Sequence, residues 1–217
     1  MAESLNILWE DDCLLVAEKK PGINSESTSD RSGLPDLLMG EHGNYIAPIH
    51  RLDLGVGGAL LCAKTPKAAA LLSKAVAEGG IEKEYLALAH GELPESGSLE
   101  NLLFYDRKAG KSFVVDRKRN GVKTALLTFE TLQCKDTPWG PISLLRVFPK
   151  TGRTHQIRVQ FAHIGHPLLG DRKYGAAESA PLGLCCSRLT FLHPATGKPL
   201  SVSFAPTGGA WDLFPFT

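Results

Sequence analysis

The sequence predicts an α+β fold with a central mixed, mostly antiparallel β-sheet and few flanking helices. Short apolar segments rich in β-branched residues recur along the 217 residues, and turn-forming residues join most of them as hairpins. Few segments have helical periodicity, and strands do not alternate with helices as in a doubly wound fold. The length suits one domain, so we expect a single domain over residues 1–217.

The N-terminal part predicts strands separated by polar turns. "LNILWE" (5–10) and "CLLVAEK" (13–19) flank an Asp-Asp turn, and "LPDLLMG" (34–40) suggests a short helix. Pro48 limits "YIAPIHRL" (45–52) to an edge or irregular strand, whereas "GALLCAK" (58–64) is expected to be a buried strand.

The clearest helix is expected to begin after Thr65. Thr65 is a suitable N-cap, Pro66 suits the first turn and Gly79 ends the pattern. The apolar residues at helical spacing predict a buried stripe of Leu71, Leu72, Ala75 and Val76.

The rest of the chain predicts mainly strands. Single strands are expected within 83–91, 97–105 and 112–115, and hairpins within 123–149 and 185–206. A second helix is expected to begin near Thr154 and end at Gly165, with Ile157, Phe161 and Ile164 on its apolar side.

Composition indicates an ordinary folded protein. Hydrophobic residues make up 43% and charged residues 22%, which argues against global disorder. No apolar run is long enough to cross a membrane, and the N-terminus does not resemble a secretion signal. We therefore expect a cytoplasmic protein with no membrane association. Its five cysteines are odd in number and scattered, so we expect reduced thiols.

The formal net charge is only +1, yet basic residues are concentrated in one segment. Residues 107–123 contain seven lysines and arginines against one acid, Asp116. A local excess of this kind can attract a polyanion, although a solvated loop would have the same composition.

Asp53 is a first candidate for chemistry. An aspartate between two strands is most often a turn former. Here Gly55, Gly57 and Gly58 follow it, and residues without side chains would allow a planar ligand to approach the carboxylate. A nearby cation would keep Asp53 ionised as a nucleophile or a base.

The second candidate stretch is residues 150–175, "KTGRTHQIRVQFAHIGHPLLGDRKYG". Thr151, Gly152 and Thr154 suggest a helix N-terminus whose free N–H groups attract phosphate or carboxylate. Arg158 would lie one turn into this helix, and a buried arginine there needs an acid, for which Asp53 is the candidate. The alternative is that Arg153 and Arg158 are ordinary solvated arginines.

The histidines of this stretch do not predict a metal site. His163 and His166 are three residues apart and His155 is close in sequence, but no acid completes a plausible ligand set. We expect hydrogen-bonding histidines and no metal.

Four ordered motifs resemble the RluA-type RNA pseudouridine synthases. They are "HRLD" (50–53), "KEY" (83–85), the stretch 150–175 and "LTFLHPATGKPLSVSFAP" (189–206). The resemblance extends over nearly the whole chain. It implies the pseudouridine synthase catalytic fold with an active-site cleft across the sheet. It also implies an isomerase that converts specific uridines of ribosomal or transfer RNA to pseudouridine without a cofactor or metal.

The resemblance also implies the roles of three residues. Asp53 would be the catalytic aspartate, Tyr85 the aromatic residue that packs on the target base, and Arg158 the arginine that pairs with Asp53. A stacked base must be flipped out before it can be isomerised, and a tyrosine ring can replace its stacking.

RNA is the expected partner of a monomeric protein. The residues expected to contact RNA are His50, Arg51, Arg107, Lys108, Arg117, Lys118, Arg119, Lys123, Arg153 and His155.

Two departures from the family pattern leave alternatives open. Val56 and Gly57 stand where the family usually has Thr-Ser, and the sequence enters the catalytic domain without the small RNA-binding domain of many relatives. The first departure motivates an inactive RNA-binding or RNA-folding protein of the same fold. A hydrolase that uses Asp53 with His50 or His155 would explain these residues but not the ordered motifs.

Overall fold

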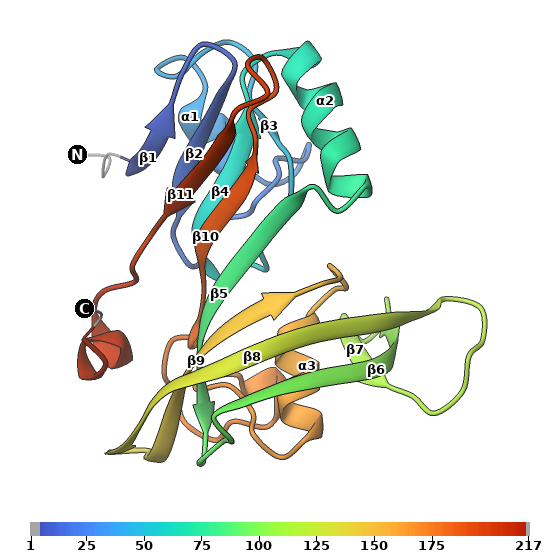
Figure 1. The fold of residues 1–217 in the computed structure, drawn as a ribbon, viewed down its shortest axis with the longest axis vertical. Coiled ribbons are helices and arrows are strands. Elements are labelled where there is room, and N and C mark those ends of the chain that lie inside the picture. The colour runs from blue at the N-terminus through green and yellow to red at the C-terminus, as the bar shows by residue number, and fades with distance from the viewer. Residues whose placement is uncertain (1–4, 216–217) are drawn as a thin grey trace. The chain divides into compact units, whose positions relative to one another are not determined.

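The structure is a computed structural model that describes residues 5–215 and divides into two compact units (Figure 1). The first unit comprises Met1–Lys83 and Cys185–Pro206, and the second Glu84–Leu184 and Thr207–Thr217. Two strands, β5 (Ile81–His90) and β10 (Leu184–Leu192), run from one unit into the other. That residues 1–217 form a single domain stays a prediction.

The first unit contains a mixed sheet. Its further strands are β1 (Ile7–Glu10), β2 (Leu14–Lys19), β3 (Ala47–Pro48), β4 (Gly57–Ala63) and β11 (Pro199–Ser203). β2 pairs antiparallel with β1 and β4, β3 pairs antiparallel with β4, and β11 with β10. β10 pairs parallel with β4. One parallel pair among antiparallel pairs confirms the predicted mixed, mostly antiparallel sheet.

The parallel pair explains why a glycine occupies position 58. Gly58 lies opposite Cys186 of β10 and has a φ of +109°, a conformation that L side chains rarely adopt. A Cβ at this position would clash with the backbone of Cys186. The chain therefore needs glycine at position 58, five residues after Asp53.

Helices α1 (Leu34–Leu38) and α2 (Pro66–Ala77) belong to the first unit and confirm the two predicted segments. The Thr65 hydroxyl accepts a hydrogen bond from Ala68 N–H at 3.1 Å, as expected of an N-cap. The predicted stripe of α2 is partly wrong, because Leu71 and Val76 are 43% and 37% exposed. Ala68 and Leu72 are the buried residues, four positions apart on one side of the helix.

The sheet of the second unit is antiparallel, with strand order β5, β9, β8, β6, β7. Its further strands are β6 (Ser96–Asp106), β7 (Lys111–Val114), β8 (Val122–Thr137) and β9 (Gly140–Pro149). β8 and β9 form the predicted hairpin, which turns at residues 138–139.

Helix α3 (Gln156–His163) packs on this sheet. Val159 joins Leu103, Ala125 and Tyr174 in one buried cluster, and the Phe161 ring meets Phe129 with centroids 5.3 Å apart. The predicted apolar side is correct for Ile157 and Phe161 but wrong for Ile164, which lies after the last helical residue and is 39% exposed.

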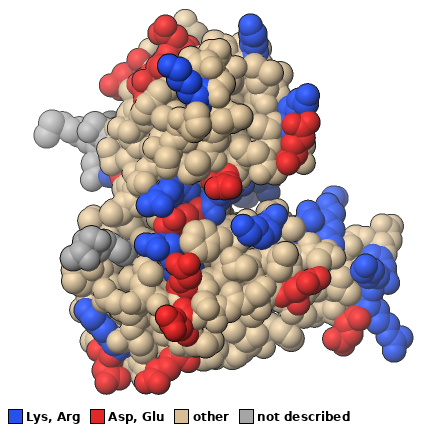
Figure 2. All heavy atoms as spheres, in the orientation of Figure 1, with Lys and Arg blue, Asp and Glu red and all other residues tan. Residues whose placement is uncertain are grey.

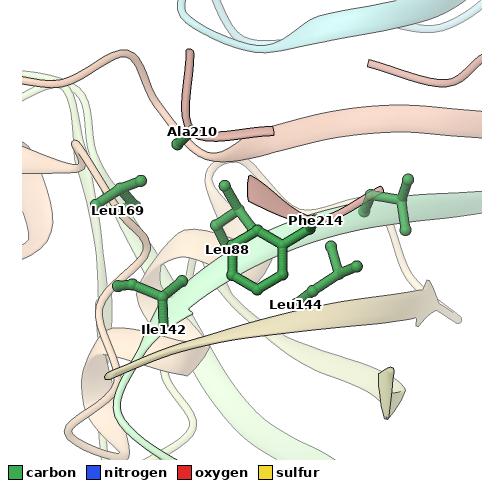
Figure 3. Close-up of a cluster of buried hydrophobic side chains, with 7 residues drawn as sticks. Leu88, Ile142, Leu144, Leu169, Ala210 and Phe214 are labelled. Atoms are coloured by element: carbon green, nitrogen blue, oxygen red, sulfur yellow. The ribbon is translucent and has the colours of Figure 1, made fainter. Parts of the chain in front are cut away.

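A second buried cluster of this unit gathers C-terminal residues on β5 and β9 (Figure 3). The Phe214 ring lies among Leu88, Ile142 and Leu144, and Ala210 and Leu169 complete the group. Through these contacts Ala210 and Phe214 pack the C-terminal segment against β5 and β9.

The predicted start of α3 at Thr154 is two residues early. His155 has a φ of +54° and is the one non-glycine residue with positive φ among residues 5–215. A left-handed residue cannot continue a right-handed helix, so α3 begins after His155.

None of the helices within residues 5–215 is long and apolar enough to cross a membrane. All five cysteines are free, which agrees with the expected reduced thiols.

Candidate active site

Asp53 lies in the tight turn that leads into β4. Its carbonyl oxygen accepts a hydrogen bond from Val56 N–H at 3.0 Å, and the turn is held from outside by Gly22 N–H, which donates to Leu54 O at 2.8 Å. The Asp53 residue is partly buried, between buried Leu52 and exposed Leu54. Hydrogen bonds of the backbone therefore hold the turn in which the partly buried Asp53 lies.

A buried lysine supports this turn. Lys19 is fully buried, and its Nζ donates to Ile23 O at 2.7 Å and to Leu54 O at 3.4 Å. Burial lowers the pKa of Lys19 to about 8, and the negative charge of Asp53 opposes this shift. Lys19 thus places a cation near Asp53. The sequence analysis did not identify Lys19, which lies at the end of a predicted strand beside a second lysine, Lys20.

His50 is buried, and its Nε2 accepts a hydrogen bond from Leu61 N–H at 3.2 Å. Burial, with the nearby Lys83 charge, lowers the pKa of His50 to about 3, so the ring is neutral at physiological pH. These observations indicate that His50 helps to hold β4, and its contact with RNA stays a prediction. Arg51 is exposed and pairs with Glu26 at 3.2 Å. Its contact with RNA stays a prediction.

Position 57 has little room for the family's usual side chain. A Cβ on Gly57 would lie 3.2 Å from Cδ of Pro21 and 3.4 Å from the carbonyl oxygen of Lys19. Glycine at position 57, where the family usually has serine, therefore fits the close packing of Lys19 and Pro21 around it.

The second unit holds Tyr85 and Arg158. Tyr85 lies on β5 opposite Val147 of β9 and is 9% exposed. Arg158 lies on α3 and is buried. Its Nε donates to Oδ2 of Asp171 at 2.7 Å and its Nη2 to Oδ1 at 2.8 Å. This bidentate pair fixes the plane of the guanidinium group.

Asp171 is a functional candidate that sequence reasoning missed. It is 1% exposed and follows α3 within "GDRKYG". The sequence did contain a signal for Asp171, because it follows Gly170 in the same motif, residues 150–175, that contains Arg158. The predicted pair of Arg158 with Asp53 involves one residue from each unit and stays a prediction.

Tyr174 connects Arg158 to the residues before α3. Its ring lies 5.2 Å from the Arg158 guanidinium carbon, and its Oη accepts a hydrogen bond from Ser112 N–H at 2.8 Å. Nδ1 of His155 lies 2.9 Å from the same Oη. Burial raises the pKa of Tyr174 to about 12, so the phenol stays protonated. His155 therefore serves structure at the start of α3, and its contact with RNA stays a prediction.

The Gln156 side chain contacts the loop that leads into α3. Oε1 of Gln156 accepts hydrogen bonds from the Thr151 hydroxyl at 2.7 Å and from Arg153 N–H at 3.1 Å. These contacts use the Thr151 hydroxyl and the Arg153 N–H, which lie before the first residue of α3. The attraction of an anion by the free N–H groups of α3 stays a prediction.

Figure 2 shows lysines and arginines at the right-hand end of the view and at other places on the same face. Arg153 is partly held, since its Nε donates to Thr124 O at 2.9 Å. Arg119 lies over the Phe104 ring at 4.8 Å. The remaining predicted residues are exposed: Arg107, Lys108, Arg117, Lys118 and Lys123.

One other group of metal-ligand residue types comes together within residues 5–215: Asp11, Cys13 and His193. Nδ1 of His193 accepts hydrogen bonds from the N–H groups of Ala195 and Thr196, so the ring proton lies on Nε2 and is donated to Asp11 Oδ2 at 2.8 Å. Burial and the hydrogen bond to Asp11 raise the pKa of Cys13 to about 11. The group is therefore a hydrogen-bonded network between two turns, not a set of free ligands.

Solved structures of similar fold are pseudouridylate synthase domains. Human RNA pseudouridylate synthase domain containing 1 matches with a TM-score of 0.79 and 24% identity over 93% of this chain and 83% of that chain. Human RNA pseudouridylate synthase domain containing 4 matches with a TM-score of 0.73 and 22% identity over 92% of this chain and 87% of that chain. The predicted fold class is confirmed.

The sequence comparisons identify the family. The RNA pseudouridylate synthase family model matches residues 13–163. A ribosomal large subunit pseudouridine synthase C of Buchnera aphidicola is 31% identical over 91% of this chain, which spans 66% of that relative's length. A tRNA pseudouridine synthase C of Pasteurella multocida is 32% identical over 92% of this chain and 90% of its own. The chain belongs to the RNA pseudouridylate synthase family, and the predicted class, an isomerase that acts on RNA, is confirmed.

Proposed function

We propose that this protein isomerises specific uridines of ribosomal or transfer RNA to pseudouridine, with Asp53 as the catalytic residue. The observation that carries the proposal is the aspartate of "HRLD" on a rigid turn, with the buried cation Lys19 close to it. The names of relatives that act on ribosomal or transfer RNA support the substrate class.

The reaction is an internal exchange of bonds. The N1–C1′ bond of uridine breaks, the base turns and a C5–C1′ bond forms. The proton on C5 leaves to solvent and N1 takes up a proton, so the product keeps the mass of uridine. Asp53 would assist either by attacking C1′ or by removing the C2′ proton to give a glycal. Both routes use the carboxylate of Asp53, and the buried amine of Lys19 lies close enough for the two charges to interact.

Tyr85 and Arg158 complete the proposed site. The Tyr85 ring would stack on the flipped uracil and replace part of its stacking in the RNA. Arg158 would pair with Asp53 through the donors that Asp171 does not use, because a guanidinium group has five N–H donors. In this proposal the two units act together as one catalytic domain.

RNA capture is assigned to the exposed basic residues of the second unit. Contacts from Arg107, Lys108, Lys123 and the basic run 117–119 to phosphates would release counterions, so binding should weaken steeply as salt rises. We further propose that the protein acts as a cytoplasmic monomer.

The alternative is an inactive RNA-binding protein, which the Val56 and Gly57 departure motivates. Digestion of treated RNA to nucleosides, followed by chromatography and mass measurement, separates these functions. Isomerisation gives a product with the mass of uridine and the retention of pseudouridine, whereas hydrolysis of the glycosidic bond adds water. RNA that binds but yields only uridine would favour the inactive protein.

A further inference from the structure

An exposed tyrosine stands among unpaired basic residues at the end of the second unit. Tyr105 is the last aromatic residue of β6 and is 40% exposed. It lies beyond the buried cluster, because Leu103, two positions earlier on the same face, is 3% exposed and packs under α3. The Tyr105 ring is therefore not needed to fill the core.

Neighbouring residues hold the Tyr105 ring without covering it. The His155 ring meets it at an interplanar angle of 89°, with centroids 6.3 Å apart. His155 is itself fixed by its contact with Tyr174 Oη. The His155 contact thus restricts the orientation of the Tyr105 ring while leaving it 40% exposed, and such restriction lowers the entropy cost of stacking.

Two segments distant in sequence carry cations at the β6–β7 hairpin, in which Tyr105 pairs with Ser112. The turn between β6 and β7 contains Arg107 and Lys108, and the short 3-10 helix after α3 contains Arg172 and Lys173. Nζ of Lys173 donates to Gly110 O at 2.9 Å, which holds the two segments together. We call the resulting set the aromatic–basic surface: Tyr105, Arg107, Lys108, Lys111, Arg172 and Lys173.

The charge of this surface is not neutralised. Within residues 5–215, none of its five cations forms an ion pair. The adjacent acids are occupied, since Asp106 accepts N–H groups of the turn and Asp171 binds Arg158. Lys111 Nζ lies 4.8 Å from the centre of the Tyr174 ring, beside His155. A cationic surface with an exposed aromatic ring has the chemistry that single-stranded nucleic acids bind.

We propose that the aromatic–basic surface binds an unpaired segment of the substrate RNA, with one base stacked on Tyr105 and its phosphates on Arg107, Lys108 and Arg172. The inference rests on the proposed function for its RNA partner and adds a preference for single-stranded RNA outside the target uridine. Arg172, Lys173 and Tyr105 were not among the residues that the sequence predicted to contact RNA.

The test compares binding of a fluorescein-labelled oligouridine and of a blunt RNA duplex by the 217-residue chain. Tyr105→Ala should raise the Kd for oligouridine by about tenfold, in the range measured for loss of base stacking, and leave duplex binding nearly unchanged. Tyr105→Phe keeps the ring and should bind like wild type.

A charge variant tests the second half of the surface. Arg172→Gln should reduce the slope of log K against log salt for oligouridine by about 0.7, the amount expected for one phosphate contact to a single strand. Lys67→Gln, which changes an exposed lysine of α2 in the first unit, should leave both affinity and slope unchanged.

Wild-type oligouridine binding by a folded Tyr105→Ala protein would overturn the stacking proposal. Equal losses for oligouridine and duplex would do the same, since they would indicate phosphate contact alone. A different result would contradict the proposed function without touching the stacking proposal. In that case the wild-type protein would make no pseudouridine in any cellular RNA, while Tyr105→Ala would still weaken the binding of oligouridine.

Discussion

Replacement of Asp171 by asparagine tests whether the buried pair holds Arg158. Asparagine keeps the shape of the side chain but loses the negative charge, and its NH₂ group would face the guanidinium donors. The Asp171 side chain is 1% exposed and that of Arg158 11%, so water cannot compensate well for the lost charge. Removing one partner of a buried pair typically costs about 3–5 kcal/mol.

This magnitude predicts a clear thermal effect. For a chain of this size, a loss of about 3–5 kcal/mol lowers Tm by about 6–20 °C. Trp139 and Trp211 pack on a buried cluster of the same unit, so tryptophan fluorescence during urea or thermal unfolding follows the relevant part of the molecule. Pseudouridine formation should fall as well, because Arg158 would lose its fixed orientation.

Glu130→Gln is the matched control. Glu130 pairs with Arg146 at 3.5 Å, but its side chain is 53% exposed, and exposed pairs contribute at most about 1 kcal/mol. If Asp171→Asn destabilises the protein no more than Glu130→Gln, the reasoning about the buried pair is refuted.

Three further perturbations have defined outcomes. Between pH 8 and 10.5 the unfolded chain binds more protons at Lys19 than the folded chain does, because burial lowers the pKa of Lys19 in the folded state. The free energy of unfolding of wild type should therefore rise with pH relative to that of Lys19→Met. Urea titrations that give parallel pH profiles for the two proteins would contradict the lowered pKa. Gly58→Ala should cost about 1–3 kcal/mol or more through its positive φ and the clash with Cys186, and an unchanged urea midpoint would count against the close β4–β10 pairing. Tyr85→Phe keeps the ring and should bind RNA like wild type in a filter assay, whereas a strong loss would indicate that the hydroxyl contacts RNA.

Strands were predictable because local patterns determine them. Alternation and β-branched residues located both strands of the long β8–β9 hairpin, and a two-residue turn closes it. Thr65 and Pro66 located the start of α2 through local chemistry. The buried side of α2 was misjudged because the helix carries apolar residues on several sides, and the position of the sheet decides that Leu72 rather than Leu71 is covered.

Features of the site that depend on tertiary packing were harder to predict. The sequence places Lys19 and Lys20 side by side, and only the pairing of β2 with β4 determines that Lys19 is directed inward. Asp171 lies 13 residues after Arg158, beyond the end of α3, so no helical spacing links the two. The left-handed His155 is also invisible to periodicity, although it decides where α3 begins.

The central claim is that Asp53 drives isomerisation of uridine in RNA. The most direct measurement incubates the purified protein with cellular RNA that carries tritium at uridine C5 and records the tritium released to water. We expect tritium release by wild type and none above background by Asp53→Asn, whose RNA binding should stay within a few-fold of wild type. Appreciable release by Asp53→Asn, or no release by wild type from any RNA fraction, would contradict the proposed role of Asp53.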